Sequence, residues 1–250
     1  MSEFSAGLRW YGSVRPGAVD QVLERAMGGE HTPYDWLARA VARSARGVLD
    51  LACGTGGLSR RLQSENRTIV GVDASMANLH RARQGGEGTW VLGHVDHVPF
   101  ADDSFDAVVT SLGLGVSSNR GQLLSDVARV LRPGGVFAAL MPSLRPVTAG
   151  DVATISRLAG FLRVTPTLPG SAEFQARKSL SLAGLTKVED TRARFFFQVT
   201  SPEDARTLIA GLRPAPDRDR SRSATDYLTA RAANAPLSVP LPMRRIVAIK

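Results

Sequence analysis

The stretch Val48-Leu49-Asp50-Leu51-Ala52-Cys53-Gly54-Thr55-Gly56-Gly57 decides the fold of this chain. Its first five residues are a short apolar run of the kind that forms a buried strand, and a glycine-rich turn follows directly. We expect a helix to begin at about Gly57, so the segment predicts strand, turn and helix. Glycines in such a turn let the backbone approach a ligand, because no Cβ stands in the way. The free N–H groups at the start of the helix point toward the same place.

The same alternation continues downstream. Further strands are predicted over residues 68–73, 89–92, 105–110 and 136–141, with helices over 76–83 and 122–131. The last of these helices stops at Arg132-Pro133-Gly134-Gly135, because proline and glycine end helices. Strands and helices alternating at this spacing predict an α/β fold. We expect a Rossmann-like, doubly wound, mostly parallel sheet with helices on both faces.

The flanking segments are less regular. Apolar residues recur at three-to-four spacing over residues 17–27 and 34–44, which predicts two helices of an N-terminal helical cap. Beyond the fifth strand we expect helices over 172–183 and 202–212, a long strand or hairpin arm over 187–199 and a closing strand over 244–249. The chain contains no internal repeat, and its composition shows no strong domain boundary.

The composition is that of an ordinary globular chain. Of its 250 residues, 43% are hydrophobic and 22% are charged, and no apolar run approaches the ~18 residues that span a bilayer. The N-terminus lacks the pattern of a signal peptide and the single cysteine fits a reducing compartment, so we expect a cytoplasmic protein that does not use a membrane. One cysteine also excludes a four-cysteine zinc site and an iron–sulfur cluster held by the chain alone.

The net charge of +8 raises the question of nucleic-acid binding, since basic surfaces collect phosphate. The arginines are dispersed, however, and only residues 213–222 form a local cluster. That cluster contains Asp217, Asp219 and two prolines, which is typical of a solvated loop. We therefore expect no specific nucleic-acid partner.

Two details of the glycine turn favour a cationic ligand over a pyrophosphate. The dinucleotide fingerprint requires a third glycine three residues after the second, and here Ser59 stands at that position. Asp50 lies on the strand four residues before Gly54, where a carboxylate would attract an ammonium group and repel a pyrophosphate. S-adenosylmethionine carries such an ammonium group, so the pattern indicates this cofactor and not NAD.

Asp73 ends the second predicted strand, 19 residues past Gly54. A carboxylate at this place can accept hydrogen bonds from both hydroxyls of a ribose, each worth roughly 1.5–3 kcal/mol. Asp73 can also cap the helix that starts near Ser75. The two roles do not exclude each other.

Four motifs of the predicted core occur in a fixed order. After residues 48–56 come Val-Gly-Val-Asp-Ala-Ser at 70–75, Val-Pro-Phe-Ala-Asp-Asp-Ser-Phe-Asp at 98–106 and Ala-Arg-Val-Leu-Arg-Pro-Gly-Gly at 128–135. Together they resemble the class I S-adenosylmethionine-dependent methyltransferases, most closely the small-molecule group with the ubiquinone/menaquinone C-methyltransferases. The resemblance covers about residues 47–142. It implies that the glycine turn holds the methionine part, Asp73 the ribose, and the residues after the third strand the adenine. We accordingly assign cofactor binding to Asp50, Ala52, Gly54, Gly56, Asp73, Ala74, His94, Val95 and Thr110.

The chain departs from the family pattern at two places. Where the family usually has an aspartate for the adenine amino group, this chain has His94. Either His94 replaces that aspartate, or Asp96 reaches the adenine, or the ring is held by the Val95 backbone and by packing. Family members also often carry a histidine or asparagine just past the fourth strand. Here Gly115 stands there, within residues 112–115, which predicts a smooth, apolar wall.

Methyl transfer requires mainly that the acceptor atom lie about 3 Å from the methyl carbon and that water be kept out. A general base is needed only for an acceptor that is still protonated at attack. The candidates are His31, His94, His97, Tyr11 and Tyr34, and we predict His97, because it lies near the cofactor motifs and histidine exchanges protons near neutral pH. His94, Asp96 and His97 share one short turn, but we predict no metal.

These observations predict one methyltransferase domain with a helical cap (1–46), a cofactor-binding core (47–142) and substrate-side segments with closing strands (143–250). The acceptor pocket is expected over the carboxyl ends of the strands, roofed by Phe4, Trp10, Tyr11 and residues 143–170 and 195–235. We expect a small, partly apolar acceptor, methylated at O, N or C. The alternatives are an RNA or protein methyltransferase, or a non-catalytic protein that binds S-adenosylmethionine.

Overall fold

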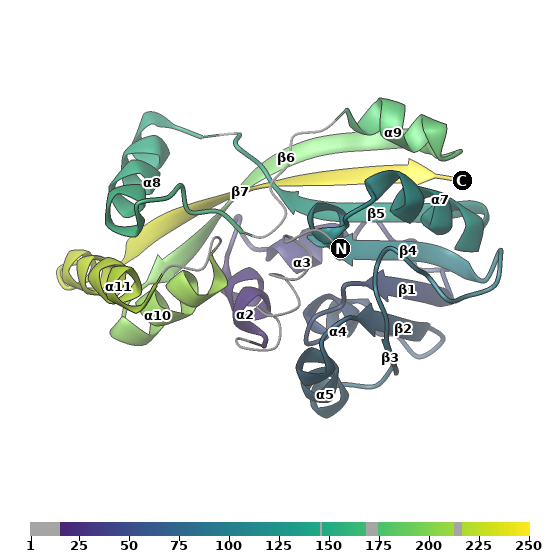
Figure 1. Cartoon of the computed structure of the whole chain (residues 1–250), viewed down its shortest axis with the longest axis horizontal. Coiled ribbons are helices and arrows are strands. Elements are labelled where there is room, and N and C mark those ends of the chain that lie inside the picture. The colour runs from purple at the N-terminus through teal and green to yellow at the C-terminus, as the bar shows by residue number, and fades with distance from the viewer. Residues whose placement is uncertain (1–15, 146, 169–174, 213–216) are drawn as a thin grey trace.

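The computed structural model describes residues 16–145, 147–168, 175–212 and 217–250, and its centre is a seven-stranded sheet (Figure 1). The strand order is β3-β2-β1-β4-β5-β7-β6. β1 to β5 are parallel, whereas β7 is antiparallel to both of its neighbours. The predicted α/β fold with a mostly parallel sheet is therefore confirmed. The strands are β1 (Gly47–Leu51), β2 (Thr68–Asp73), β3 (Thr89–Leu92), β4 (Phe105–Ser111), β5 (Leu131–Pro142), β6 (Thr186–Val199) and β7 (Leu237–Ile249).

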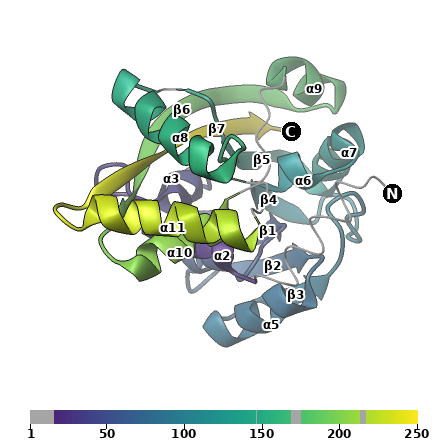
Figure 2. The same ribbon diagram turned by 60° about the vertical axis from the view of Figure 1, so that its left-hand side comes forward.

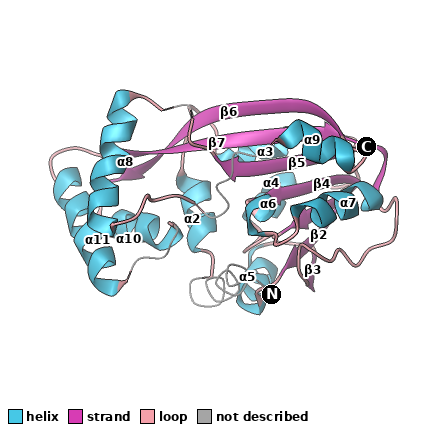
Figure 3. Ribbon diagram, turned by 45° about the horizontal axis from the view of Figure 1, so that its top comes forward, coloured by secondary structure: helices cyan, strands magenta, loops and turns pink. Residues whose placement is uncertain are grey.

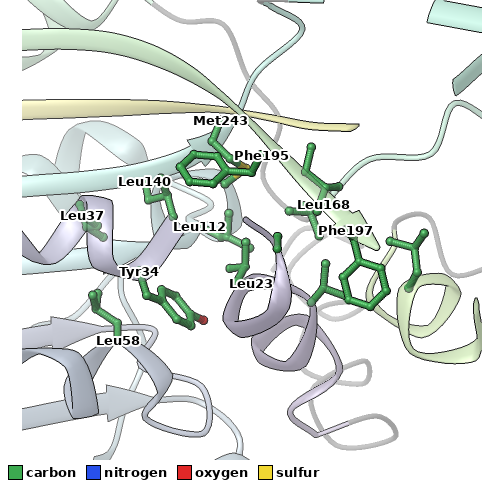
Figure 4. Close-up of a cluster of buried hydrophobic side chains, with 14 of the residues drawn as sticks. Leu23, Tyr34, Leu37, Leu58, Leu112, Leu140, Leu168, Phe195, Phe197 and Met243 are labelled. Carbon is green, nitrogen blue, oxygen red and sulfur yellow. The ribbon is translucent and has the colours of Figure 1, made fainter. Parts of the chain in front are cut away.

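Helices cover both faces of this sheet because neighbouring strand residues point to opposite sides. Val48 packs in one hydrophobic cluster with helices α2 to α4, and Leu49 packs in another with α7 and α9. Figure 4 shows part of the first cluster, where Leu140 of β5 and Leu112, which follows β4, lie near Leu23 of α2. The helices are α2 (Ala18–Arg25), α3 (Pro33–Ala38), α4 (Gly57–Leu62), α5 (Met76–Gly85), α6 (Gly113–Val116), α7 (Arg120–Val130), α8 (Ala149–Leu162), α9 (Ala176–Leu182), α10 (Pro202–Gly211) and α11 (Arg218–Ala232).

The antiparallel pair β6–β7 extends the sheet well beyond the ends of the parallel strands. These strands contain 14 and 13 residues, against 7 in β4. Helices α8, α10 and α11 gather at their far end (Figures 1 and 3), and α8 packs against α11 (Figure 2). A second, helical body is thus built beside the carboxyl ends of β4 and β5. None of the helices within the described ranges is long and apolar enough to cross a membrane.

The predicted elements of the core agree with the structure to within a few residues, and three features outside it differ. Residues 218–222 of the predicted solvated loop form the start of α11, because Asp217 caps that helix by accepting a hydrogen bond from the Arg220 backbone N–H (2.8 Å). The helix expected over 34–44 ends at Ala38, and the Arg67 guanidinium binds the carbonyls that follow, at Ala42 and Ala45. Helix α8 was not expected.

Candidate functional site

The glycine turn between β1 and α4 has a backbone conformation that few side chains tolerate. Ala52, Gly54 and Gly56 have φ values of 57°, 56° and 79°, and for alanine this left-handed conformation is strained. A Cβ at Gly54 would lie 2.6 Å from an Asp20 carboxylate oxygen, and one at Gly56 would lie 2.9 Å from the Trp90 ring. The turn is therefore packed from two sides, and only glycine fits at both positions.

Asp20 of helix α2 holds this turn in place. Its Oδ2 accepts hydrogen bonds from the backbone N–H of Thr55 (2.7 Å) and from the Thr55 hydroxyl (2.6 Å). The Tyr34 hydroxyl donates to its Oδ1, and Figure 4 shows the Tyr34 ring beside α2. Burial raises the pKa of Tyr34 well above its usual value, so the phenol keeps its proton. Tyr34, one of the candidate bases, is thus a buried hydrogen-bond donor, and no motif in the sequence pointed to Asp20.

A second set of contacts fixes Thr55 through its carbonyl oxygen. Arg60 of α4 donates to the carbonyl oxygen of Thr55 (2.7 Å) and to the Glu24 carboxylate of α2 (2.6 Å). The backbone N–H and C=O of Thr55 are therefore both linked to α2, the N–H through Asp20 and the C=O through Arg60 and Glu24. The cap stabilises the conformation that the turn needs to bind a ligand.

Asp50 provides a buried carboxylate of which only one oxygen has a hydrogen-bond partner among the described residues. Its side chain is 1% exposed, and Oδ2 accepts a hydrogen bond from the Ser59 hydroxyl (2.6 Å). Its Oδ1 is buried without a hydrogen-bond partner among the described residues. Burial raises the pKa of Asp50 to about 7. Since an unpaired buried polar atom costs free energy, this oxygen fits a ligand that brings a cationic donor, such as the ammonium group of S-adenosylmethionine.

Asp73 joins the glycine turn to the start of α5. One oxygen accepts from the Gly54 backbone N–H (2.9 Å), and the other from the backbone N–H of Ser75 (2.9 Å) and the Asn78 amide (3.2 Å). Burial raises the pKa of Asp73. Ser75, and not Asp73, is the N-cap of α5. A carboxylate has about four acceptor positions, so about one remains for a ribose hydroxyl, and the ribose role stays a prediction.

The turn after β3 contains the residues predicted to face the adenine. The Asp96 backbone N–H donates to His94 Nδ1 (3.2 Å), so a neutral His94 carries its proton on Nε2 and offers a donor. Val95 is buried and His97 is exposed. Among the alternatives for adenine, this geometry favours His94 or Val95, because Asp96 is occupied elsewhere.

Asp96 ties this turn to the segment after α6. It accepts hydrogen bonds from the hydroxyls of Ser117 and Ser118 and from the Ser118 backbone N–H (3.1 Å). Burial alone would raise the pKa of Asp96, but these donors outweigh it and hold the pKa below its usual value. Asp96 therefore connects two loops of the site.

We expect His94→Ala to weaken the binding of S-adenosylhomocysteine by about threefold, which corresponds to one modest hydrogen bond. Asp96→Ala should instead lower the free energy of unfolding by about 1.5–3 kcal/mol, since it removes a charged acceptor of several hydrogen bonds. Calorimetry and thermal unfolding of both variants check this. A larger loss of affinity in Asp96→Ala, with unchanged stability, would place the adenine contact at Asp96.

The remaining predicted residues lie around the ends of β1 and β4. The Thr110 hydroxyl donates to the Leu51 carbonyl (2.7 Å) and joins these two strands. Ala74 is exposed beside Asp73. Leu112 has a φ of 67°, and a Cβ at Gly113 would lie 2.1 Å from the Thr110 hydroxyl. The segment after β4 therefore packs closely on the end of β1, and the apolar stretch 112–115 lies there as expected.

The other candidate bases do not gather at the turn. His31 lies at the surface, where its Nδ1 is 2.9 Å from an Arg39 guanidinium nitrogen. Tyr11 lies outside the described residues, as do Phe4 and Trp10 of the predicted roof. Within the described part of the chain, no group of three or more His, Cys, Asp or Glu side chains is arranged to hold a metal ion.

The strand order and the glycine turn define a Rossmann-like α/β protein in which a buried carboxylate oxygen without a partner among the described residues lies beside the turn. Residues 49–139 match the methyltransferase domain family. The chain is 40% identical over 124 residues to an uncharacterised methyltransferase of Synechocystis sp., covering 48% of this chain and 58% of that protein. It is 32% identical over 140 residues to the ubiquinone/menaquinone biosynthesis C-methyltransferase of Paracoccus denitrificans, covering 52% of each. The chain spans a little over half the length of these relatives.

Solved structures share the same fold. A protein of Bacillus halodurans described as a methyltransferase has a TM-score of 0.61 and 19% identity, covering 87% of this chain and 98% of that one. The [4+2]-cyclase SpnF has a TM-score of 0.63 and 19% identity, covering 98% and 96%. These similarities concern the fold alone. The family match identifies a methyltransferase domain over residues 49–139 and implies S-adenosylmethionine as its cofactor.

Proposed function

We propose that the chain transfers the methyl group of S-adenosylmethionine to a small-molecule acceptor, at oxygen, nitrogen or carbon. The observation that carries this proposal is the buried, unpaired Oδ1 of Asp50. It lies beside the turn at Gly54 and Gly56, two positions where only glycine fits. The family match over residues 49–139 supports the same cofactor. In this proposal residues 1–250 act as one domain, with the cap, the core and the segments after residue 142 in the roles predicted above.

The proposed cofactor-binding residues act mainly by position. Asp50 accepts the ammonium group, and the turn at Gly54 and Gly56 allows close approach of the backbone. Asp73 offers its remaining acceptor position to the ribose, and His94 with Val95 borders the adenine. Ala52, Ala74 and Thr110 complete the proposed site around the ends of β1, β2 and β4.

When bound, S-adenosylmethionine supplies a methyl group activated by a sulfonium sulfur, which leaves as a neutral thioether. The transfer is an in-line displacement, so the chain must orient the acceptor and exclude water, and this chemistry requires no metal. An acceptor that is protonated at attack gives up its proton to solvent or to a base. We propose His97 for that role. It is exposed, so water can compete with it.

The test is to incubate the protein with cofactor labelled in the methyl group and either total RNA, total protein or an extract of small metabolites. We expect the label in the small-molecule fraction. Label in RNA or protein instead would establish one of the alternative acceptors. Absence of label in all fractions, with tight binding of S-adenosylhomocysteine, would establish a protein that binds the cofactor without turnover.

The salt dependence of RNA binding tests the nucleic-acid alternative independently of the labelling experiment. Of the arginines outside the core, Arg220 pairs with Asp217 (3.1 Å) and Arg206 with Glu203 (2.8 Å). Because each phosphate contact releases a counterion, binding that depends on dispersed charges falls steeply with salt. We expect weak, sequence-independent RNA binding that disappears near physiological salt, as measured by fluorescence anisotropy at several salt concentrations. Affinity that persists at high salt would contradict this expectation.

A further inference from the structure

A cavity of about 300 Å³ lies between the end of β5, helix α8 and the first half of β7. Its walls include Pro142 and Ser143 after β5, Ile155 on α8, and Leu241 and Met243 on β7. We call this space the α8 cavity. It is formed by residues from Pro142 onward, and the glycine turn does not line it.

The α8 cavity and the glycine turn lie at the same edge of the sheet, which is formed by the carboxyl ends of the parallel strands. The backbone N–H of Leu112 donates to the Leu140 carbonyl (2.8 Å), which ties the segment after β4 to the end of β5. A Cβ at Gly113 would lie 3.4 Å from Ala52 of the cofactor turn. Ala139 lies level with Leu51 two strands away, and Pro142 is three residues further along β5, so Pro142 lies about 14 Å from the end of β1 at the usual strand spacing and rise. A molecule in the cavity can therefore reach toward the cofactor turn across the apolar segment 112–115.

The chemistry of the walls restricts what can bind. Among the described residues that line the cavity, none is charged, and the polar ones carry only hydroxyl groups: Ser143, Ser156, Thr165 and Thr167. Moving an ionised group into such surroundings without a partner costs far more than moving a hydroxyl that finds a hydrogen bond. A carboxylate or phosphate on the acceptor would therefore oppose binding.

The rim of the cavity points to the same kind of ligand. Leu144 and Val152 line the cavity and are 66% and 49% exposed. A ligand that covers apolar side chains such as these gains the free energy of removing them from water. The volume of about 300 Å³ lies at the lower end of the range of about 300–1,000 Å³ for small-molecule sites, which suits one or two rings.

We propose that the α8 cavity holds the methyl acceptor, and that this acceptor is an uncharged, mainly apolar ring compound with a hydroxyl or similar group. This proposal rests on the proposed function. In the reaction, one acceptor atom gains the methyl group and loses a proton to solvent, while the carbon–sulfur bond of the cofactor breaks. The neutral acceptor body lies among the side chains of α8 and β7.

The test compares two probes that share the hydroxynaphthalene ring, 2-naphthol and the carboxylate 6-hydroxy-2-naphthoate, with the full chain saturated by S-adenosylhomocysteine. We expect 2-naphthol to bind at least about tenfold more tightly, because only the naphthoate brings a charge into the cavity. Fluorescence titration at neutral pH measures both affinities. Equal affinities, or tighter binding of the naphthoate, would overturn the proposal.

A matched pair of variants places the probe in this cavity. Val152 lines it, whereas the next residue of α8, Ala153, is exposed and does not. Val152→Asp should weaken 2-naphthol binding about tenfold, and Ala153→Asp, which adds the same charge to the same helix, should change it less than about twofold. Equal effects of the two variants would show that 2-naphthol binds elsewhere and would overturn the assignment.

The failure of the proposed function has a different signature. If the metabolite extract accepts no label while the probes and variants behave as expected, the methyl transfer is wrong and the cavity remains a site for uncharged apolar ligands. If label appears in small molecules that an anion exchanger retains, methyl transfer stands and the neutral acceptor is wrong. Label in unretained molecules that pass into organic solvent, lost in Val152→Asp and kept in Ala153→Asp, supports both.

Discussion

Gly54→Ala is expected to lower the affinity for S-adenosylhomocysteine about a hundredfold. The new Cβ would lie 2.6 Å from Asp20 Oδ2, at a residue whose φ of 56° disfavours any side chain. Asp20 would have to move and release the Thr55 backbone N–H, a charge-assisted bond worth roughly 1.5–3 kcal/mol. The left-handed backbone adds about 1–2 kcal/mol of strain. Together these terms give about 3 kcal/mol, or a factor of about one hundred in affinity.

Gly134→Ala is the matched control for this experiment. Gly134 has a φ of 77°, so the backbone strain is similar, but a Cβ there meets nothing within 4 Å. It lies in β5 at the irregularity between Leu131 and Val136, which both pair with β4, and its backbone N–H donates to the Lys250 carbonyl. This variant should lose about 1 kcal/mol of stability and keep its affinity. Equal loss of affinity in both variants, by titration calorimetry, would show that strain alone and not the contact with Asp20 explains the effect.

The core could be predicted from the sequence because its signals are local. Each parallel strand contains a short apolar run, and the predicted strand over 89–92 has the same bounds as β3. The position of Asp73 opposite Gly54 also follows locally, since parallel strands of similar length end at one edge of the sheet. A hydrogen bond of 2.9 Å now joins the two residues.

Helix α10 of the far body was predicted over 202–212, but α8 and α11 could not be predicted because they bury little of their surface. Only Ala224 and Leu228 of the fifteen residues of α11 are buried, too few for a recognisable apolar stripe. In α8 the buried residues are Asp151, Leu158 and Leu162. These helices are stabilised by contacts with each other and with β6 and β7, which are distant in sequence.

The residues that hold the loops of the site in place were not predicted either, because they too are distant in sequence from their partners. Asp20 precedes Thr55 by 35 residues, so no spacing rule connects them. The hydrogen bonds of Asp96 join the turn after β3 to the segment after α6, across 21 and 22 residues. The sequence pattern pointed to Asp50 and Asp73, the acids proposed to contact the cofactor, but not to the acids that hold the loops in place.

Asp50 should make cofactor binding depend on pH. Its pKa is raised from 3.8 to about 7, first because it is buried and also because Asp20 and Asp73 lie nearby. Between pH 4 and 7 the folded chain therefore holds a proton that the unfolded chain has lost, so this residue makes stability fall as pH rises through that window. An ammonium ligand needs the ionised carboxylate. Its affinity should thus rise with pH, opposite in sign to the effect on stability.

The expected increase in the affinity for S-adenosylhomocysteine between pH 6 and pH 8 is about tenfold, because at pH 6 only about one molecule in ten carries an ionised Asp50. Asp50→Asn keeps the hydrogen bond from Ser59 within reach but cannot ionise, so its affinity should be lower and should not vary over this range. Titration calorimetry at four pH values measures both proteins, and His94→Ala, which changes a residue proposed to border the adenine and not the ammonium group, should keep the wild-type slope. An unchanged slope in Asp50→Asn would mean that another group, such as Asp73, carries the proton, since burial also raises the pKa of Asp73. A slope lost in Asp50→Asn alone would show that the unpaired carboxylate oxygen receives the cation of the cofactor.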